Sequence, residues 1–155
     1  MNRPPALALR GLAGKETPMD HEVIIYSVTE GRFYDYAGPL LYQCYSGKRG
    51  IWCNNPEYEA EKNLGPIPRG RWTFGAPYHS AKTGPLSIPL IPAGHGAYGR
   101  SGFQIHGDNA ESDASEGCIV APRALRGLFA SALADGREPI LYVVSTVGLR
   151  PILKR

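Results

Sequence analysis

The sequence lacks any long apolar run, and no hydrophobic stretch approaches the roughly 20 residues that a helix needs to cross a bilayer. It also lacks an excess of charge, because 17 Lys and Arg residues against 14 Asp and Glu residues leave a net charge of +3. The basic residues are scattered along the chain and form no patch of the kind that binds nucleic acid. We therefore expect neither a transmembrane helix nor a nucleic-acid partner.

Cysteine is scarce, with three residues in the chain of 155. Cys44 and Cys53 lie on either side of a short polar turn, so they either form a disulfide in an oxidising compartment or stay reduced and packed. Cys118 lies far from both in the sequence and is left as a free thiol in either case.

Glycine and proline are abundant instead, with 19 and 14 residues, and they favour many turns over long helices. A hydrophobic content of 43% suits a packed core, and 155 residues are the size of one domain. Short strand patterns are separated by turn signals, with one helix pattern and no alternation of strands with helices. We predict a mainly β fold, an antiparallel β-sandwich or barrel with one main helix after Cys118.

Strands are predicted where β-branched and aromatic residues gather or alternate with polar ones. A helix is predicted to begin at Pro122 and to end near Gly136, with an apolar stripe that faces the core. Residues 47–68 are predicted to form a surface loop, which we interpret as a flap over a cleft. The predicted strands are residues 23–28, 32–36, 40–45, 71–74, 86–90, 102–106 and 140–147, the last of them buried on both faces.

A histidine and a cysteine lie close together in the second half of the chain. His106 ends a strand pattern and is followed by the turn residues Gly107 and Asp108, and Cys118 lies between Gly117 and a β-branched run. An imidazole takes the proton of a thiol and returns one to a leaving group. Gly117 leaves the approach to the thiol open and lets backbone N–H groups converge on an oxyanion. The pattern indicates acyl transfer; a packed cysteine and a structural histidine are the alternative from residue types alone.

The second ring nitrogen of His106 needs a partner that fixes its tautomer. Asp108 is a candidate for this role, and a backbone carbonyl is the alternative, since a carboxylate two residues away can also cap the following turn. Ser115 either positions a substrate or shapes the loop before Cys118.

The pair His106-Gly107 and the Ser-Glu-Gly-Cys-Ile motif at residues 115–119 resemble the signature of the L,D-transpeptidase (YkuD-like) catalytic domain. The chain is more similar still to the branch of that superfamily that occurs as type VI secretion effectors of the Tlde1 kind. Glu116 stands where the general signature has a histidine, and Val120 where an arginine is common. Further pieces that fit the branch are residues 65–72, 84–87 and 99–103, and the similarity runs from about residue 22 to residue 146.

This resemblance implies a cysteine enzyme without a cofactor that acts on the tetrapeptide stems of peptidoglycan. Cys118 attacks the carbonyl of the bond between an L-centre and the terminal D-alanine, with His106 as base. Transfer of the acyl group to water gives an L,D-carboxypeptidase, and transfer to a D-amino acid or a neighbouring stem gives an L,D-transpeptidase. The expected catalytic residues are Cys118, His106, Gly117 and Asp108, and the expected substrate contacts are Ser115, Glu116, Arg123 and Arg100.

The first residues carry no hydrophobic segment of the length of a secretion signal. We expect residues 1–20 to be a flexible arm, residues 21–147 the catalytic domain and residues 148–155 a tail. The protein is thus expected to be made in the cytoplasm without a Sec signal. The resemblance to effectors implies secretion and action in the periplasm of a target bacterium, with an immunity protein and a component of the secretion apparatus as partners.

Two functions of other classes stay open. A metal-dependent peptidase would use His95, His106, Asp108 and Cys118 as ligands, at spacings that match no familiar ligand motif. A non-catalytic wall-binding module would keep the fold without turnover. A papain-like protease is disfavoured, because in such enzymes the cysteine precedes the histidine along the chain.

Overall fold

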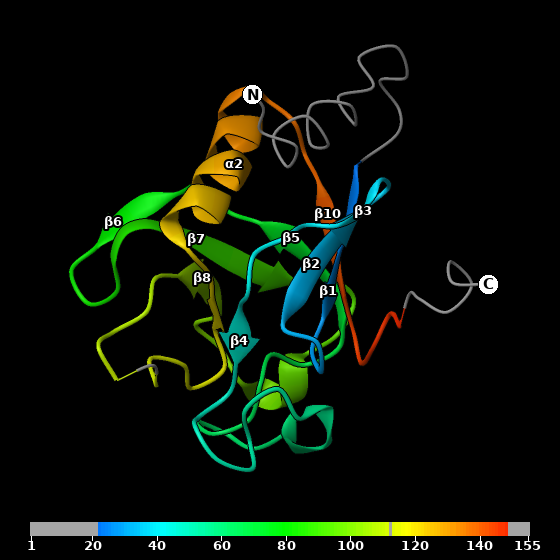
Figure 1. The fold of residues 1–155 in the computed structure, drawn as a ribbon, viewed down its shortest axis with the longest axis vertical. Coiled ribbons are helices and arrows are strands. Elements are labelled where there is room, and N and C mark those ends of the chain that lie inside the picture. The colour runs from blue at the N-terminus through cyan, green and yellow to red at the C-terminus, as the bar shows by residue number, and fades with distance from the viewer. Residues whose placement is uncertain (1–21, 112, 149–155) are drawn as a thin grey trace.

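The computed structural model describes residues 22–111 and 113–148. The helical elements of this part are α2 (Arg123–Ala134) and two 3-10 turns, η1 (Pro56–Tyr58) and η2 (Ala97–Gly99). The strands are β1 (Val23–Ser27), β2 (Arg32–Asp35), β3 (Gly38–Pro39), β4 (Tyr45–Ser46), β5 (Gly70–Phe74), β6 (Tyr78–Ser80), β7 (Gly84–Pro92), β8 (Gln104–His106), β9 (Ile119–Val120) and β10 (Ile140–Val144). These strands lie side by side in the order β3-β2-β1-β10-β5-β7-β8-β9-β4, and β6 also pairs with β7 (Figure 1).

The described strands form a mixed sheet. Most neighbours are antiparallel, but β1 pairs with β10 and β8 pairs with β9 in parallel. The β1–β2 hairpin turns at Gly31, whose φ of +64° suits glycine and where a Cβ would clash with the Cys44 carbonyl oxygen. The predicted mainly β fold with one main helix after Cys118 is confirmed, and the two parallel pairs are the feature that the prediction lacked.

Two strand predictions are wrong in their details. Residues 40–45 form no continuous strand, because the Leu40 and Cys44 N–H groups donate to carbonyls of the β1–β2 hairpin and its turn instead of entering one ladder. The strand predicted at residues 140–147 ends at Val144 and is not buried on both faces, since Tyr142 is 39% exposed. An apolar run therefore marks this strand correctly but does not show how many of its faces are covered.

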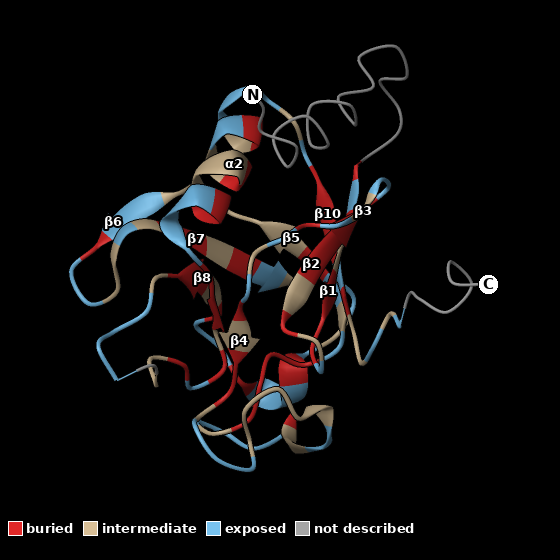
Figure 2. Ribbon diagram, viewed as in Figure 1, coloured by how far each residue is buried: buried red, intermediate tan, exposed pale blue. Residues whose placement is uncertain are grey.

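The core lies between α2 and the sheet, where Figure 2 shows buried segments of both. Phe129 of α2 meets Phe33 of β2 with ring centroids 5.0 Å apart, and Phe74 of β5 at 5.8 Å. Trp72 is fully buried, and its indole N–H donates to the Pro68 carbonyl at 3.1 Å. Burying an aliphatic or aromatic side chain of this size stabilises a fold by about 1.5–3 kcal/mol, so this core holds the sheet rigid behind the motif residues.

Strands β8 and β9 bring the two motif residues together. Ile105 and Ile119 are partners in register, and both are fully buried. Side chains alternate between the two faces of a strand. His106 at the end of β8 and Cys118 directly before β9 therefore lie on the face opposite these isoleucines.

No helix among the described residues is long and apolar enough to span a bilayer. The arm expected at residues 1–20 lies outside the described residues, as does the expected tail beyond residue 148. Residues 47–68 form a loop with η1 as their one helical turn, as predicted. Its movement over a cleft stays a prediction.

Candidate active site

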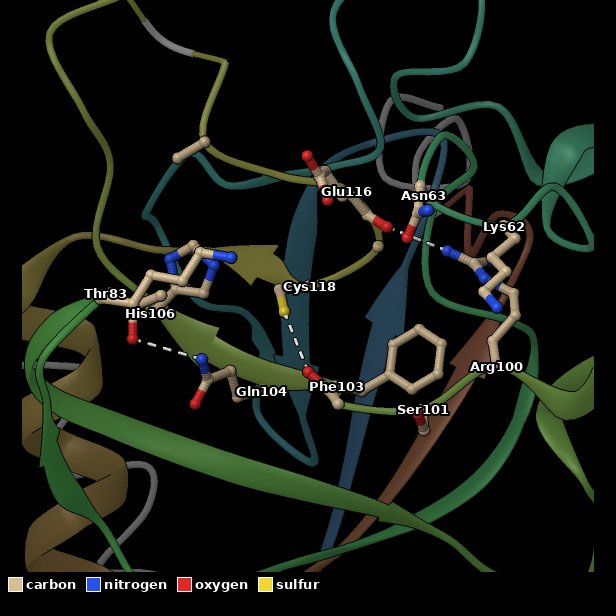
Figure 3. A pocket seen from close by; sticks show the side chains of 14 residues that line it. Lys62, Asn63, Thr83, Arg100, Ser101, Phe103, Gln104, His106, Glu116 and Cys118 are labelled. Atoms are coloured by element: carbon tan, nitrogen blue, oxygen red, sulfur yellow. Dashed lines mark hydrogen bonds between the residues drawn. The ribbon is translucent and has the colours of Figure 1, made fainter.

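His106 and Cys118 line the same pocket, which has a volume of about 410 Å³ (Figure 3). Strand β8 and the segment before β9 form its base, and the turn between β6 and β7 borders it. The loop of residues 47–68 contributes Lys62 and Asn63 to its lining. The pocket is therefore built from segments that lie far apart in the sequence.

Cys118 is half-buried, and its Sγ donates to the Gly102 carbonyl at 3.5 Å. Burial raises the pKa of the Cys118 thiol to about 11, although the backbone N–H of Gln104 and the charge of Arg100 favour the thiolate. The resting side chain is therefore a neutral thiol. It needs a base before it can attack a carbonyl.

His106 is 3% exposed, and its Nδ1 lies 2.8 Å from the Gly107 carbonyl oxygen. Because a carbonyl oxygen only accepts, Nδ1 carries the proton and Nε2 keeps its lone pair. Burial lowers the pKa of His106 below its ordinary value of 6.5; the bond to Gly107 opposes this shift, and the positive charge of Arg126 adds to it. At neutral pH the ring is an unprotonated base.

The thiol and the imidazole face one pocket, and each is held by a backbone carbonyl rather than by the other. Attack on a substrate requires the Cys118 thiol to turn from the Gly102 carbonyl towards Nε2 of His106. A rotation about the Cα–Cβ bond moves a side chain between staggered positions without shifting the backbone. Hydrogen bonds between catalytic groups are often incomplete until substrate is bound.

Two buried hydroxyls shape the loop before β9. Ser115 Oγ donates to the Cys118 carbonyl at 2.6 Å, and it accepts the N–H groups of Gly117 at 3.1 Å and Gly47 at 2.8 Å. Ser46 Oγ donates to the Gly117 carbonyl at 3.2 Å. The Gly117 N–H is thus already bonded, whereas among the described residues none accepts the Cys118 N–H. The N–H of Cys118 is the donor available to an oxyanion.

Arg100 lines the pocket but is only 7% exposed. Its bonds join residues 59–66 to the loop that carries Cys118. A Cβ on Gly117 would clash with the guanidinium, so glycine is needed for this close approach. The guanidinium donates to the carbonyl oxygens of Glu59, Gly65, Pro66 and Glu116.

Arg123 is exposed in the first turn of α2 and does not line the pocket, so its predicted contact with a substrate carboxylate stays a prediction. Arg126, one turn later, is buried and donates to the carbonyls of Ala121 at 2.9 Å and Pro85 at 2.8 Å. Its charge lowers the pKa of His106. This role was not predictable from the sequence, because an arginine within a helix pattern is ordinarily a solvated side chain.

Asp108, predicted as a partner of His106, makes its hydrogen bonds elsewhere. Its Oδ1 accepts from the Tyr45 hydroxyl at 2.5 Å and from the Asn109 N–H at 2.8 Å. The Gly107 carbonyl holds the imidazole, which is the alternative that the sequence left open. Asp108 acts on His106 only through its charge, which raises the pKa of the imidazole against the larger effect of burial.

The side chain of Glu116 lines the pocket and is exposed, and its predicted contact with a substrate stays a prediction. Its Oε2 lies 3.8 Å from Lys48 Nζ. An exposed ion pair at this distance contributes little to stability, so the carboxylate can leave it for a ligand.

His95 lies apart from the pocket lining and uses both ring nitrogens. Its Nδ1 accepts the Ala97 N–H at 3.1 Å, and its Nε2 lies 3.0 Å from the Arg71 carbonyl. Its ring packs edge-on against Trp72. Within residues 22–111 and 113–148, no three side chains of His, Cys, Asp or Glu gather as metal ligands. The set of ligands considered from the sequence is therefore not assembled in this structure.

Cys44 and Cys53 are free thiols here, the reduced state of the two that the sequence left open. Burial raises the pKa of Cys44 to about 12 and also raises that of Cys53. Neither lines the pocket of Cys118.

The sequence and the fold of this chain are each similar to known proteins over a large part of its length. A family model described as the Tlde1 domain matches residues 41–138. The helical cell shape determining protein Pgp2 of Campylobacter jejuni has a TM-score of 0.55 and 14% identity, over 97% of this chain and 59% of that one. An L,D-transpeptidase of Xylanimonas cellulosilytica has a TM-score of 0.45 and 17% identity, over 81% and 61%. The likeness to Pgp2 shows a shared fold, and the chain spans about three fifths of each neighbour's length. No curated protein sequence matches the chain significantly.

Proposed function

Since the chain belongs to the Tlde1 domain family, we propose that it is a peptidoglycan enzyme that cleaves the bond before the terminal D-alanine of tetrapeptide stems. The acyl group passes through a thioester of Cys118 to water or to a D-amino acid. The enzyme is thus an L,D-carboxypeptidase, an L,D-transpeptidase or both. The observation that carries the proposal is that a neutral thiol and an unprotonated imidazole, Cys118 and His106, open into one pocket.

In the first half of the reaction, Nε2 of His106 takes the thiol proton as Sγ of Cys118 attacks the scissile carbonyl carbon. The carbonyl oxygen becomes an oxyanion, which the N–H of Cys118 stabilises; one such donor contributes about 3–4 kcal/mol to a transition state. The imidazolium then protonates the leaving nitrogen. The C–N bond breaks, D-alanine leaves as a neutral amine, and a thioester is left on the enzyme.

In the second half, an acceptor enters where D-alanine left. His106, again neutral, takes a proton from water or from the amine of a D-amino acid as it attacks the thioester carbonyl. The C–S bond breaks and the sulfur leaves with the proton that His106 returns. Water yields a tripeptide stem, and a D-amino acid yields an exchanged tetrapeptide stem.

The test is to incubate purified muropeptides with the wild type and with Cys118→Ala, and to identify products by mass spectrometry. We expect the wild type to release D-alanine and Cys118→Ala to release none. Addition of a different D-amino acid separates exchange from hydrolysis by the mass of the product. Cys53→Ala is the matched control, because it removes another half-buried thiol outside the pocket and keeps activity.

The same assay separates the proposal from the other functions considered. Alkylation of the thiol is expected to abolish release of D-alanine, and a chelator is expected to leave it unchanged. Inhibition by the chelator together with full activity of Cys118→Ala would establish a metal-dependent peptidase. A non-catalytic wall-binding module would bind peptidoglycan and release nothing.

We also propose that the protein is an antibacterial effector that acts in the periplasm of a target bacterium, which the family membership supports. Expression in a susceptible bacterium with a periplasm-directing signal is expected to stop growth, and expression without the signal is expected to be tolerated. Cys118→Ser is expected to remove the growth defect. A toxic Cys118→Ser variant would mean that the effect does not depend on the thiol.

A further inference from the structure

The pocket contains three cationic side chains, those of Lys62, Lys82 and Arg100. Arg100 is buried and donates to backbone carbonyls. The two lysines are exposed, and within the described ranges neither forms an ion pair with a carboxylate. Two ammonium groups are therefore available to an anion that enters the pocket.

Lys82 belongs to the side of the pocket that holds His106. Its neighbour Thr83 accepts a hydrogen bond from the Gln104 side chain at 3.2 Å, and the backbone N–H of Gln104 contacts the Cys118 sulfur. Figure 3 shows Thr83 and His106 on the same side of the Cys118 thiol. Lys82 is thus the neighbour in sequence of Thr83, whose side chain is hydrogen-bonded to Gln104 at the floor of the pocket.

The turn that carries Lys82 is fixed by hydrogen bonds. Ser80 Oγ accepts the backbone N–H groups of Lys82 at 3.1 Å and Thr83 at 2.9 Å. Thr83 Oγ1 also lies 2.7 Å from Ser87 Oγ in β7. A fixed backbone with a long flexible side chain lets an ammonium reach a ligand near His106 without a movement of the loop.

The other lysine lies elsewhere in the pocket. Figure 3 shows Lys62 beside Asn63, across the Cys118 thiol from His106. The charge of Lys82 lowers the pKa of His106 and favours the thiolate of Cys118, whereas that of Lys62 is not among the causes acting on either group. Of the two free cations, Lys82 belongs to the chain segment on the His106 side of the pocket, and its charge acts on both His106 and Cys118.

The chemistry of the leaving group decides what an ammonium in this place can bind. His106 protonates the nitrogen of the leaving D-alanine, so the leaving residue lies on the His106 side of the thiol. The α-carboxylate of that residue is attached to the same carbon as the nitrogen. A cation on the His106 side of the pocket is therefore the one placed to meet this carboxylate.

We propose that the Lys82 ammonium binds the free α-carboxylate of the terminal D-alanine, which makes Lys82 a specificity-determining residue for peptides that end at the residue to be released. The inference rests on the proposed function, because it needs D-alanine as the leaving group. The acceptor in an exchange reaction enters at the same place. Lys82 therefore also binds the carboxylate of an incoming D-amino acid.

The test compares two synthetic substrates, a tetrapeptide stem that ends in D-alanine and the same peptide that ends in D-alaninamide. We expect the wild type to prefer the carboxylate by about tenfold or more in kcat/KM, since a charge-assisted hydrogen bond is lost with the amide. Lys82→Ala is expected to lower kcat/KM for the carboxylate by a similar factor, mainly through KM, and to bring the two substrates close to equality. Lys82→Arg is expected to keep most of the preference.

Lys62→Ala is the matched control, because it removes the other free cation, and its preference for the carboxylate is expected to equal that of the wild type. Lys82→Ala with an unchanged preference would overturn the inference, as would a wild type that cleaves both peptides equally. A general effect of the charge on Cys118 would slow both substrates alike and leave the preference intact. A wild type that releases neither product overturns the proposed function itself, and this inference with it.

Discussion

Arg100 and Arg126 are each 7% exposed, and each lies beside a glycine that adjoins a reacting residue. Arg100 approaches the backbone where Gly117 precedes Cys118, and Arg126 approaches it where Gly107 follows His106. Both guanidinium groups donate to backbone carbonyls. Each half of the candidate site therefore has a buried arginine packed against the backbone next to Cys118 or His106.

The two cations differ in what they join. Arg100 joins residues 59–66 to the carbonyl of Glu116, so it ties the pocket-lining loop to the segment that carries Cys118. Arg126 joins the start of α2 to the first residues of β7, because it donates to the carbonyls of Ala121, Pro85 and Leu86. Both charges lower the pKa of the group beside them. Arg100 favours the thiolate of Cys118, and Arg126 favours the neutral imidazole of His106. Together they keep the base free of a proton and ease the loss of the thiol proton.

Truncation of the two arginines has the largest expected effect. A buried carbonyl that loses its partner costs about 1–3 kcal/mol, so we expect Arg100→Met to lower the free energy of unfolding by about 4 kcal/mol and Arg126→Met by about 3 kcal/mol. Urea denaturation measures both. Arg123→Met on the exposed side of α2 is the control, with a change within about 0.5 kcal/mol. The reverse order of the two buried variants would contradict the view that Arg100 joins more of the molecule.

Alanine at the two glycines tests the close approaches directly. Gly117 has a φ of +137° and a Cβ there would clash with Arg100, whereas Gly107 has no positive φ and its Cβ would lie 2.9 Å from the Arg126 guanidinium. We expect Gly117→Ala to cost about 2 kcal/mol of stability and Gly107→Ala about 1 kcal/mol or less. Gly117→Ala should also slow turnover strongly, because it moves the Cys118 N–H. Equal losses of stability would show that the positive φ carries no strain.

The placement of His106 and Cys118 in one pocket and the fold class could be predicted from the sequence because both leave local signals. His106 ends a strand pattern and Cys118 sits in a motif of adjacent residues, so neither requires knowledge of distant contacts. Arg126, Ser46 and Lys82 gave no such signal. Each reaches the site because segments distant in the sequence meet there, as in the bond from Ser46 to the Gly117 carbonyl, with a sequence separation of 71.

The fold shows the same limit. The helix α2 was predictable because its apolar side chains recur at helical spacing, and its buried residues include Leu125 and Phe129. Strand β6 was missed because its residues are mostly exposed, and without β7 beside it they carry no alternation. Parallel pairing of β8 with β9 also leaves no mark in either strand, since it is fixed by the path of the chain between them.

Each arginine charge lowers the pKa of the group beside it, so removal of either charge is expected to raise that pKa. Burial lowers the pKa of His106, so kcat/KM should fall only below pH 6.5, where the base takes up a proton. Arg126→Gln removes a positive charge near the ring, raises the pKa of His106 and moves this acid limb to higher pH. An acid limb that Arg126→Gln leaves unmoved would contradict the proposed role of His106 as the base.

Arg100→Gln raises the pKa of the Cys118 thiol above about 11, so alkylation by iodoacetamide at fixed pH should slow. Alkylation of Cys53 in the same sample gives the reference rate. An unchanged rate at Cys118 would mean that the charge of Arg100 does not act on this thiol.

The smallest expected effect on stability is at Glu30, a carboxylate outside the pocket lining. Like the two arginines, it is a charged group held by several hydrogen bonds. Burial raises the pKa of Glu30, but hydrogen bonds outweigh it, first that from Tyr34 and then those from Gly148, Ser27 and Val147, and the pKa is about 2. Because this value lies below the ordinary 4.5, the stabilisation is present above pH 4.5 and is lost as the pH falls towards 2. We expect Glu30→Gln to cost about 1 kcal/mol at pH 7, with the difference from the wild type vanishing in acid denaturation curves. Activity at pH 7 should stay unchanged, since Glu30 holds the end of the sheet and not the pocket.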